Sequence, residues 1–476
     1  MLFRSNGGAD CYFGLGLYRI ENASTTANVY GPFNPTPTTD LIGAKTFTGR
    51  AISRILVDAA DPATIFVSTA SGIGGANYEA FGASPPITAL RGVYRSSNAT
   101  SLTPSFAKLT VTASGSIAPD VTGNAVVNDL AYAPNDATGN TIVAWVNAAA
   151  SAGNGGIYRT TNAKAASPTF TQVFTTTTAS VRGTFATTAA GNGATILVGT
   201  GEAATGTSCI TANGVLRLSR DGGATWSGKL AGGGGYCGSQ CFYDLPVAIS
   251  PTDTSLILIG GSGNSTCSRV FARSTNAGAT FTGSGVADVG MHADAHAIVF
   301  APSDPSIVYE ASDGGIYRSA DGGATWTSRN TTGLSAAQYV GIATHPTDAF
   351  FTIGGTQDNG TQWYKPDGTW YRIDYGDGGN TVIDQNTSST STLTMYHTYY
   401  NSRSNLVGYA KVTSMASAGD GLWGFLGNGS NGIALTENPN FYAPLVRGPG
   451  NPNTIYYRSE EHTSELQSPD HLVCRL

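Results

Sequence analysis

The segment His292-Ala-Asp294-Ala-His296 holds residue types well suited to chemistry in this 476-residue chain. On a β-strand, residues two and four positions apart point to the same face, so two imidazoles and a carboxylate would face one way. That arrangement suits a divalent metal, with His292, Asp294 and His296 as ligands, or a His–Asp pair that moves protons or binds a ligand. The same groups could instead satisfy one another, or the backbone, in a purely structural role.

Carboxylates form a second set of candidates. Asp358 lies in Gly355-Thr-Gln-Asp-Asn-Gly360 and Asp377 in Tyr375-Gly-Asp-Gly-Gly379. Glycosidic bonds are hydrolysed by two carboxyl groups, one acting as the acid and the other as the base or nucleophile, so Asp294, Asp358 and Asp377 are the candidate catalytic residues. The alternative is turn formation, because Asp beside Gly is common in tight turns. Nearby aromatic side chains could stack on sugars or fill a core: Trp363, Tyr364, Trp370 and Tyr371.

These residues must be positioned by a repeated element. An aliphatic–aromatic pair, Arg and Ser lead into a turn of the form Ser-x-Asp-Gly-Gly-x-Thr-Trp, best preserved at 319–326, 219–226 and 274–281. Ser and Asp side chains can bond to the backbone inside such a turn, and Gly permits positive φ. The terminal aromatic ring can pack on neighbouring strands. The structural positions are Ser219, Asp221, Gly223, Trp226, Ser274, Asn276, Gly278, Phe281, Ser319, Asp321, Gly323 and Trp326.

An apolar strand, a Pro/Asp turn and another apolar strand precede each copy, as in 245–259 and 297–309. Each unit is therefore expected to contain four antiparallel strands, and the repetition of such units predicts an all-β fold, a β-propeller. We expect about seven blades, with partial units at both ends. One ring and part of a tandem pair of propellers both fit this pattern.

The recurring turn resembles the Asp-box (BNR) repeat of sialidase, xyloglucanase and sortilin-type propellers, over roughly residues 1–457. The resemblance implies that the box lies on an outer turn, so that Asp221 and Asp321 form turns and are not catalytic acids. It also implies that function gathers at the central opening, where the innermost strands begin. The candidate ligand-binding residues at or near these positions are His292, His296, Asp244, Tyr243, Gln338 and Trp363.

Composition excludes several classes of function. Charged residues make up 12% of the chain, the net charge is −6 and no stretch is rich in Lys or Arg, which argues against nucleic-acid binding. No apolar run approaches the ~18–20 residues of a membrane span. We expect a monomer whose partner is a carbohydrate or an extracellular protein.

Four of the six cysteines lie within residues 209–267, and Cys237 and Cys241 are close in sequence. A structural disulfide there fits an oxidising compartment, whereas a Cys-only metal site is the alternative. Spacing alone does not give the connectivity. We therefore expect an extracellular or cell-surface protein, although residues 1–8 lack a secretory apolar segment. Since the chain begins inside a repeat, the natural N-terminus is expected upstream.

Residues 458–476 differ from the rest, with six charges in nineteen residues and no Gly. The segment resembles a translated sequencing-library adapter, so we treat it as non-native and exclude it from the fold. The propeller, residues 1–457, is then expected to be incomplete at both ends.

The leading hypothesis is a secreted propeller that binds carbohydrate or protein, or serves as a scaffold, because the repeats come without a recognisable catalytic set. The alternative is a polysaccharide-active glycoside hydrolase of the xyloglucanase type. A sialidase fits less well, because only five Glu precede Arg458 and no arginine cluster is evident. No cofactor is predicted apart from the divalent metal considered above.

Overall fold

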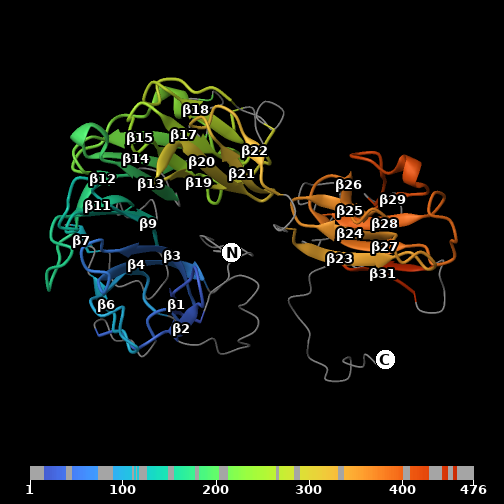
Figure 1. Ribbon diagram of the computed structural model, residues 1–476, viewed down its shortest axis with the longest axis horizontal. Helices are drawn as coiled ribbons and strands as arrows, with labels where there is room; N and C mark the ends of the chain where they lie inside the picture. Colours follow the sequence, from blue (N-terminus) through green and yellow to red (C-terminus); the bar gives the residue numbers. More distant parts are fainter. Residues whose placement is uncertain are drawn as a thin grey trace. The chain divides into compact units, whose positions relative to one another are not determined.

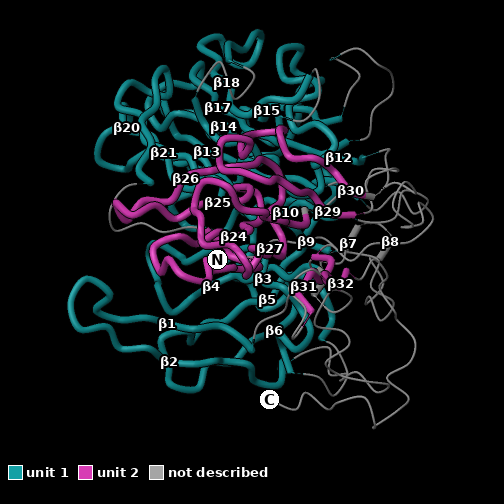
Figure 2. The backbone as a smooth tube through the Cα atoms, turned by 90° about the vertical axis from the view of Figure 1, so that its right-hand side faces the viewer, with its two compact units in different colours: residues 1–331 teal, residues 332–476 magenta. Residues whose placement is uncertain are grey.

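The computed structural model is all-β, as predicted, and contains no α-helix among the residues that it describes. Its described strands form antiparallel sheets of two to four strands. The chain divides into two compact units, residues 1–331 and 332–476 (Figure 2). The described residues are 15–38, 45–72, 89–109, 112–113, 115–116, 126–147, 155–176, 182–202, 209, 213–263, 267–283, 290–330, 337–399, 408–427, 442–448 and 454–457.

Unit 1 contains five sheets of three or four described strands, each pairing its strands in chain order. Figure 1 shows these sheets following one another in an arc. Their strands are β3 (Arg50–Val57), β4 (Ile65–Gly72), β5 (Gly92–Ser96) and β6 (Ala107–Leu109); β9 (Val126–Tyr132), β10 (Ile142–Asn147), β11 (Gly156–Thr160) and β12 (Thr171–Thr175); β13 (Gly183–Thr188), β14 (Thr195–Thr200) and β15 (Val215–Ser219); β16 (Val247–Ile249), β17 (Ile257–Gly260) and β18 (Phe271–Ser274); and β19 (Ala295–Ala301), β20 (Asp304–Ser312), β21 (Gly315–Ser319) and β22 (Thr327–Ser328). Two-stranded sheets are formed by β1 (Leu17–Glu21) with β2 (Asn28–Phe33), and by β7 (Thr112–Ala113) with β8 (Gly115–Ser116).

Unit 2 repeats the same arrangement. Its two four-stranded sheets and one two-stranded sheet also follow chain order. The strands are β23 (Tyr339–Thr344), β24 (Thr352–Thr356), β25 (Gly360–Tyr364) and β26 (Trp370–Asp374); β27 (Gly378–Ile383), β28 (Met395–Tyr399), β29 (Gly408–Val412) and β30 (Gly424–Gly427); and β31 (Leu445–Arg447) with β32 (Ile455–Tyr457).

The first strand of each sheet lies against the first strand of the next, from β3 to β9, β13, β16 and β19 in unit 1 and from β23 to β27 and β31 in unit 2. Apolar side chains fill the space between consecutive sheets: Phe66 and Val93 of one sheet pack with Leu130 and Ile142 of the next. This is how the blades of a β-propeller pack, so the predicted fold class is confirmed. Seven blades and the boundary at residue 457 remain predictions.

The recurring turn is held by side chain–backbone hydrogen bonds. At 319–326, Ser319 Oγ donates to Asp321 Oδ1 at 2.7 Å and accepts from Gly323 N at 2.8 Å. Asp321 also accepts from the backbone N and the hydroxyl of Thr325. The hydroxyl bond, opposed by slight burial, lowers the pKa of Asp321 to about 2. The same bonds form at 219–225. At 274–280 the backbone bonds are the same, but the side-chain amide of Asn276 donates to the hydroxyl of Thr280. We call these segments the box turns.

The arginine of the repeated phrase joins neighbouring sheets, a role that sequence patterns did not suggest. In four sheets it donates to a backbone carbonyl in the corresponding turn of the next sheet. The pairs are Arg19 to Ala99, Arg95 to Ala163, Arg159 to Gly222 and Arg273 to Gly322, at N–O distances of 2.9, 2.8, 2.9 and 3.0 Å. The arginine therefore joins each of these sheets to the turn that follows the third strand of the next sheet.

Four cysteines form two disulfides, Cys209–Cys267 and Cys237–Cys241. The predicted disulfide is present, and the alternative Cys-only metal site is wrong for these four residues. Cys11, Cys474 and the segment 458–476 lie outside the described residues.

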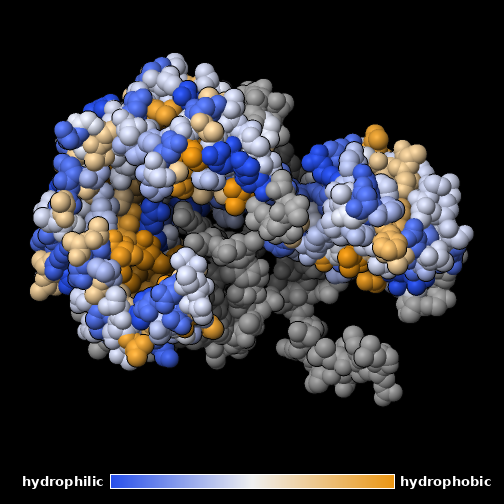
Figure 3. Space-filling view, viewed as in Figure 1, coloured by the Kyte–Doolittle hydropathy of each residue, from blue (hydrophilic) through white to orange (hydrophobic). Residues whose placement is uncertain are grey.

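The surface of both units mixes hydrophilic and hydrophobic residues on the face that Figure 3 shows. Within the described part of the chain, no helix has the length and apolar character that a membrane crossing requires.

Candidate functional site

A group of ionisable side chains gathers where β19 begins in unit 1. His296 Nε2 lies 2.5 Å from Asp313 Oδ1, and His296 Nδ1 lies 3.3 Å from Asp244 Oδ1. The side chains of His296 and Asp313 are 28% and 23% exposed, whereas that of Asp244 is fully buried. We call Asp244, Asp294, His296 and Asp313 the acidic cluster.

Asp294 joins this cluster in a backbone conformation that is unusual for a residue other than Gly. Its φ is +61°, in the left-handed region that Asp tolerates better than most residues. Its Oδ1 accepts a hydrogen bond of 2.6 Å from Gln240 Nε2. One carboxylate oxygen of Asp294 also lies within 4.8 Å of one from Asp313.

The prediction that His292, Asp294 and His296 share one strand face was wrong. β19 begins only at Ala295, so the two-residue period does not extend back to His292. His292 Nδ1 instead lies 2.9 Å from the carbonyl of Ala293. Of the three residues, Asp294 and His296 belong to the acidic cluster. Asp294 lies just before β19 and His296 near its start, so strand alternation does not bring them together.

Burial and like charge govern protonation in the cluster. Burial raises the pKa of Asp244, and the neighbouring carboxylates of Asp294 and Asp313 raise it further. Both effects favour the protonated, neutral form of the Asp244 carboxyl group. Burial, together with the charge of Asp313, also raises the pKa of Asp294.

An aromatic pair borders the cluster. The ring of Tyr243 meets the imidazole of His296 edge to face, with 4.7 Å between the ring centroids. Phe242, which precedes Tyr243 in the chain, is 56% exposed. The backbone here is held by Arg182, whose Nη1 donates to the carbonyl of Tyr243 at 2.8 Å. The predicted residues Tyr243, Asp244, Asp294 and His296 are thus brought together.

The remaining predicted residues lie in unit 2. The backbone N of Asp358 donates to Asp377 Oδ1 at 2.9 Å, and Asp358 has a φ of +63°. Gln338 Nε2 donates to Gln357 Oε1 at 3.1 Å. These bonds join residues within unit 2, whereas Asp294 lies in unit 1. Convergence of Asp358 and Asp377 with Asp294 therefore remains a prediction.

The predicted sugar-stacking aromatics divide into two kinds. Trp363 is half-buried and packs on the core of unit 2, with its ring centroid 5.6 Å from that of Phe351. Trp370 packs between Tyr339 and Tyr364 at centroid distances of 5.0 and 5.2 Å, yet is 41% exposed. Trp363 therefore fits the core interpretation, whereas Trp370 remains accessible.

Two residues of the site, Asp313 and Gln240, were not selected from the sequence. Asp313 lies in Ser312-Asp-Gly-Gly315, which shares the Asp–Gly pattern of the Asp358 and Asp377 segments, but Asp313 was not chosen as a catalytic candidate. Gln240 had no such signal, because its position depends on a loop closed by a disulfide.

Of the three predicted metal ligands, Asp294 and His296 lie in the acidic cluster and His292 does not. Asp294 and Asp313 offer carboxylate oxygens close together. Both ring nitrogens of His296, however, face carboxyl groups, and a metal ion on Nε2 would have to replace the contact with Asp313. The metal set of His292, Asp294 and His296 remains a prediction.

No family model matches the chain, and no curated protein matches it. Among solved structures, it is similar to an ancestral GH74 enzyme (14% identity, 60% of this chain and 36% of that chain, TM-score 0.29). It is also similar to the GH74 xyloglucanase from Xanthomonas campestris (15%, 88% and 59%, 0.22) and to YCF48 from Cyanidioschyzon merolae (14%, 68% and 97%, 0.33). The chain thus spans 36% and 59% of the lengths of these two GH74 structures.

Proposed function

We propose that this propeller is a binding protein for neutral carbohydrate and that the acidic cluster of unit 1 holds the ligand. The observation that carries the proposal is the partly exposed His296–Asp313 pair beside the ring of Tyr243, which in turn lies near the ring of Phe242. Sugars present hydroxyl groups at their edges and apolar C–H faces, so their sites combine hydrogen-bonding side chains with aromatic rings.

The charge of the cluster favours neutral over acidic sugars. Asp294 and Asp313 are carboxyl groups that accept hydrogen bonds from sugar hydroxyls. A sialic or uronic acid would bring its own carboxylate close to them, where like charges repel. The basic group beside the cluster, Arg182, is 7% exposed and already donates to the carbonyl of Tyr243.

A second candidate function, retaining glycoside hydrolysis, is favoured by the carboxyl groups of Asp294 and Asp313. The pKa of Asp294 is raised by burial, as a general acid requires, and its carboxyl group lies within 4.8 Å of that of Asp313. In retaining glycosidases, the two carboxyl groups are about 5 Å apart. Asp294 would then protonate the leaving oxygen, and Asp313 would attack the anomeric carbon.

Binding is tested by affinity electrophoresis and calorimetry with soluble xyloglucan, mixed-linkage β-glucan and galactomannan, with polygalacturonate as the anionic comparison. We expect Asp313→Asn and Tyr243→Ala to weaken binding to the neutral ligand by about tenfold or more. Asp420→Asn is the matched control, because Asp420 is an exposed Asp paired with Arg372 in unit 2. The proposal fails if no neutral polysaccharide binds, or if the two site variants bind as the wild type does.

A reducing-end assay on the same polysaccharides separates the two candidates. Binding without turnover supports the binding protein. Turnover that Asp294→Asn abolishes while binding persists supports the hydrolase.

A further inference from the structure

We infer that the loop closed by Cys237–Cys241 is the device that positions the acidic cluster, and that Gln240 is its positioning residue. The effect on ligand binding rests on the proposed function, whereas the effect on the conformation of Asp294 does not.

Gln240 contacts two aspartates of the cluster, Asp294 and Asp244. Its side chain donates to Asp294 Oδ1 at 2.6 Å. Its carbonyl accepts from the backbone N of Tyr243 and of Asp244, at 2.7 and 2.8 Å. One residue therefore sets the position of Asp294 through its side chain and that of Asp244 through its backbone.

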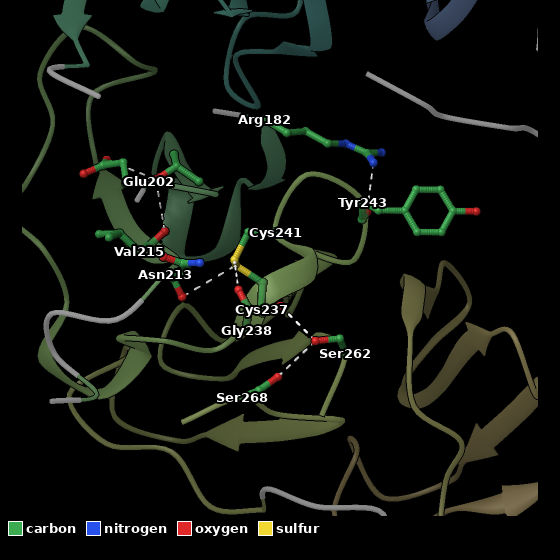
Figure 4. The surroundings of a disulfide bond; sticks show 11 residues. Arg182, Glu202, Asn213, Val215, Cys237, Gly238, Cys241, Tyr243, Ser262 and Ser268 are labelled. Carbon is green, nitrogen blue, oxygen red and sulfur yellow. Dashed lines mark hydrogen bonds between the residues drawn. A yellow bond between two sulfur atoms is a disulfide. The ribbon is translucent and has the colours of Figure 1, made fainter. Parts of the chain in front are cut away.

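The disulfide holds Gln240 within a five-residue loop, because it joins the residues on either side of the short 3-10 helix Gly238–Gln240. Cys237 and Cys241 are 0% and 5% exposed. Ser262 Oγ donates to the carbonyl of Cys237 at 3.1 Å, which ties the loop to the segment after β17 (Figure 4).

Glycines leave space for this loop at three separate points of the chain. A Cβ at Gly214 would lie 2.4 Å from Cys237 Sγ, and one at Gly201 would lie 2.5 Å from the carbonyl oxygen of Cys241. A Cβ at Gly261 would lie 2.4 Å from the carbonyl oxygen of Tyr236. The loop thus packs closely against backbone on several sides, and its position is fixed by contacts that only glycine permits.

The chemistry of Gln240 suits this role. Asp294 keeps a left-handed backbone conformation while it stands near the carboxyl groups of Asp244 and Asp313. A neutral amide donor stabilises the carboxyl group of Asp294 without adding a charge that would neutralise the cluster. A residue without that donor would remove the amide contact to Asp294 Oδ1.

The test is a double-mutant cycle between Gln240→Leu and the pair Cys237→Ser/Cys241→Ser. The first readout needs no ligand: hydrogen exchange of the peptide covering residues 290–297, which contains the bond from Ala295 N to Gly261 O. We expect faster exchange in both variants. The second readout is affinity for the neutral polysaccharide, with an expected loss of about tenfold in each.

If the loop acts through Gln240, the combined variant loses no more exchange protection or affinity than the more strongly affected of the two separate variants. Additive losses, or exchange at the wild-type rate, would overturn the inference. Cys209→Ser/Cys267→Ser is the matched control, because it removes the other disulfide, and an equal effect there would also overturn the inference. If the wild type binds no polysaccharide, the proposed function fails, while the exchange readout still decides the role of the loop.

Discussion

Glu310 is a buried acid that should make the protein less stable as the pH rises. It lies in β20 and is 1% exposed, and its strand neighbours are Ile298 and Tyr317. Neither carboxyl oxygen has a hydrogen-bond partner among the described residues. Burial therefore raises the pKa of Glu310 from 4.5 to about 9.

The sign and size of the effect follow from proton linkage. The folded state keeps the proton on Glu310 up to about pH 9, whereas the unfolded state releases it above pH 4.5. The contribution of Glu310 to stability is thus full below pH 4.5 and is lost progressively up to pH 9. At 1.4 kcal/mol per pH unit, the loss by pH 7.5 is about 4 kcal/mol, and local relaxation or entry of water would reduce it to about 2.

Glu310→Gln removes the titration and preserves the shape of the side chain. We expect the variant to match the wild type in urea unfolding near pH 4.5, and to exceed it by about 2–4 kcal/mol near pH 7.5. A difference that does not change with pH would refute the reasoning.

Glu202→Gln is the opposite control. Although burial raises the pKa of Glu202, the hydrogen bond and charge of Arg217 lower it overall. The ionised form of Glu202 is therefore the stable one, and its replacement should cost stability at neutral pH.

Three further predictions concern the repeat and the site. Asp321→Ala removes the acceptor of its box turn and should lower the free energy of unfolding by about 1–2 kcal/mol in urea titrations, with no change in ligand affinity. Arg273→Met removes the contact with Gly322 and should cost about 1 kcal/mol by the same measurement. If the metal prediction is correct, elemental analysis after metal supplementation should give about one equivalent that Asp294→Ala abolishes, and less than about 0.1 equivalent in the wild type would contradict it.

The fold was predictable because its signal repeats. Each box turn places Ser, Asp or Asn, and Gly at constant spacing, and local hydrogen bonds such as that of Ser319 with Asp321 depend on nothing distant. Strands covered on both sheet faces were also readable, because they form short apolar runs, as in 245–259.

The site was predictable only in part, because it depends on where elements end. The segment 292–296 contains two residues of the acidic cluster, but its apparent two-residue period is broken at Ala295, where β19 starts. Asp313 lies in the turn between β20 and β21, and Gln240 lies in the connection between β15 and β16. Contacts of this kind are set by tertiary packing, and local patterns do not encode them.

One strand of unit 1, β15, departs from the repeat at the arginine position. Leu218 holds the place in β15 that Arg159 holds in β11. Arg217, one residue earlier and so on the other face of the sheet, pairs with Glu202 and stacks on Phe174. The two ends of the connection between β14 and β15 contact the disulfide loop, since Gly201 lies against Cys241 and Gly214 against Cys237. In this sheet, an apolar residue stands where the other sheets have the arginine that contacts the next turn. The departure from the repeat therefore coincides with the loop that positions Asp244 and Asp294, which links the local loss of regularity to the support of the site.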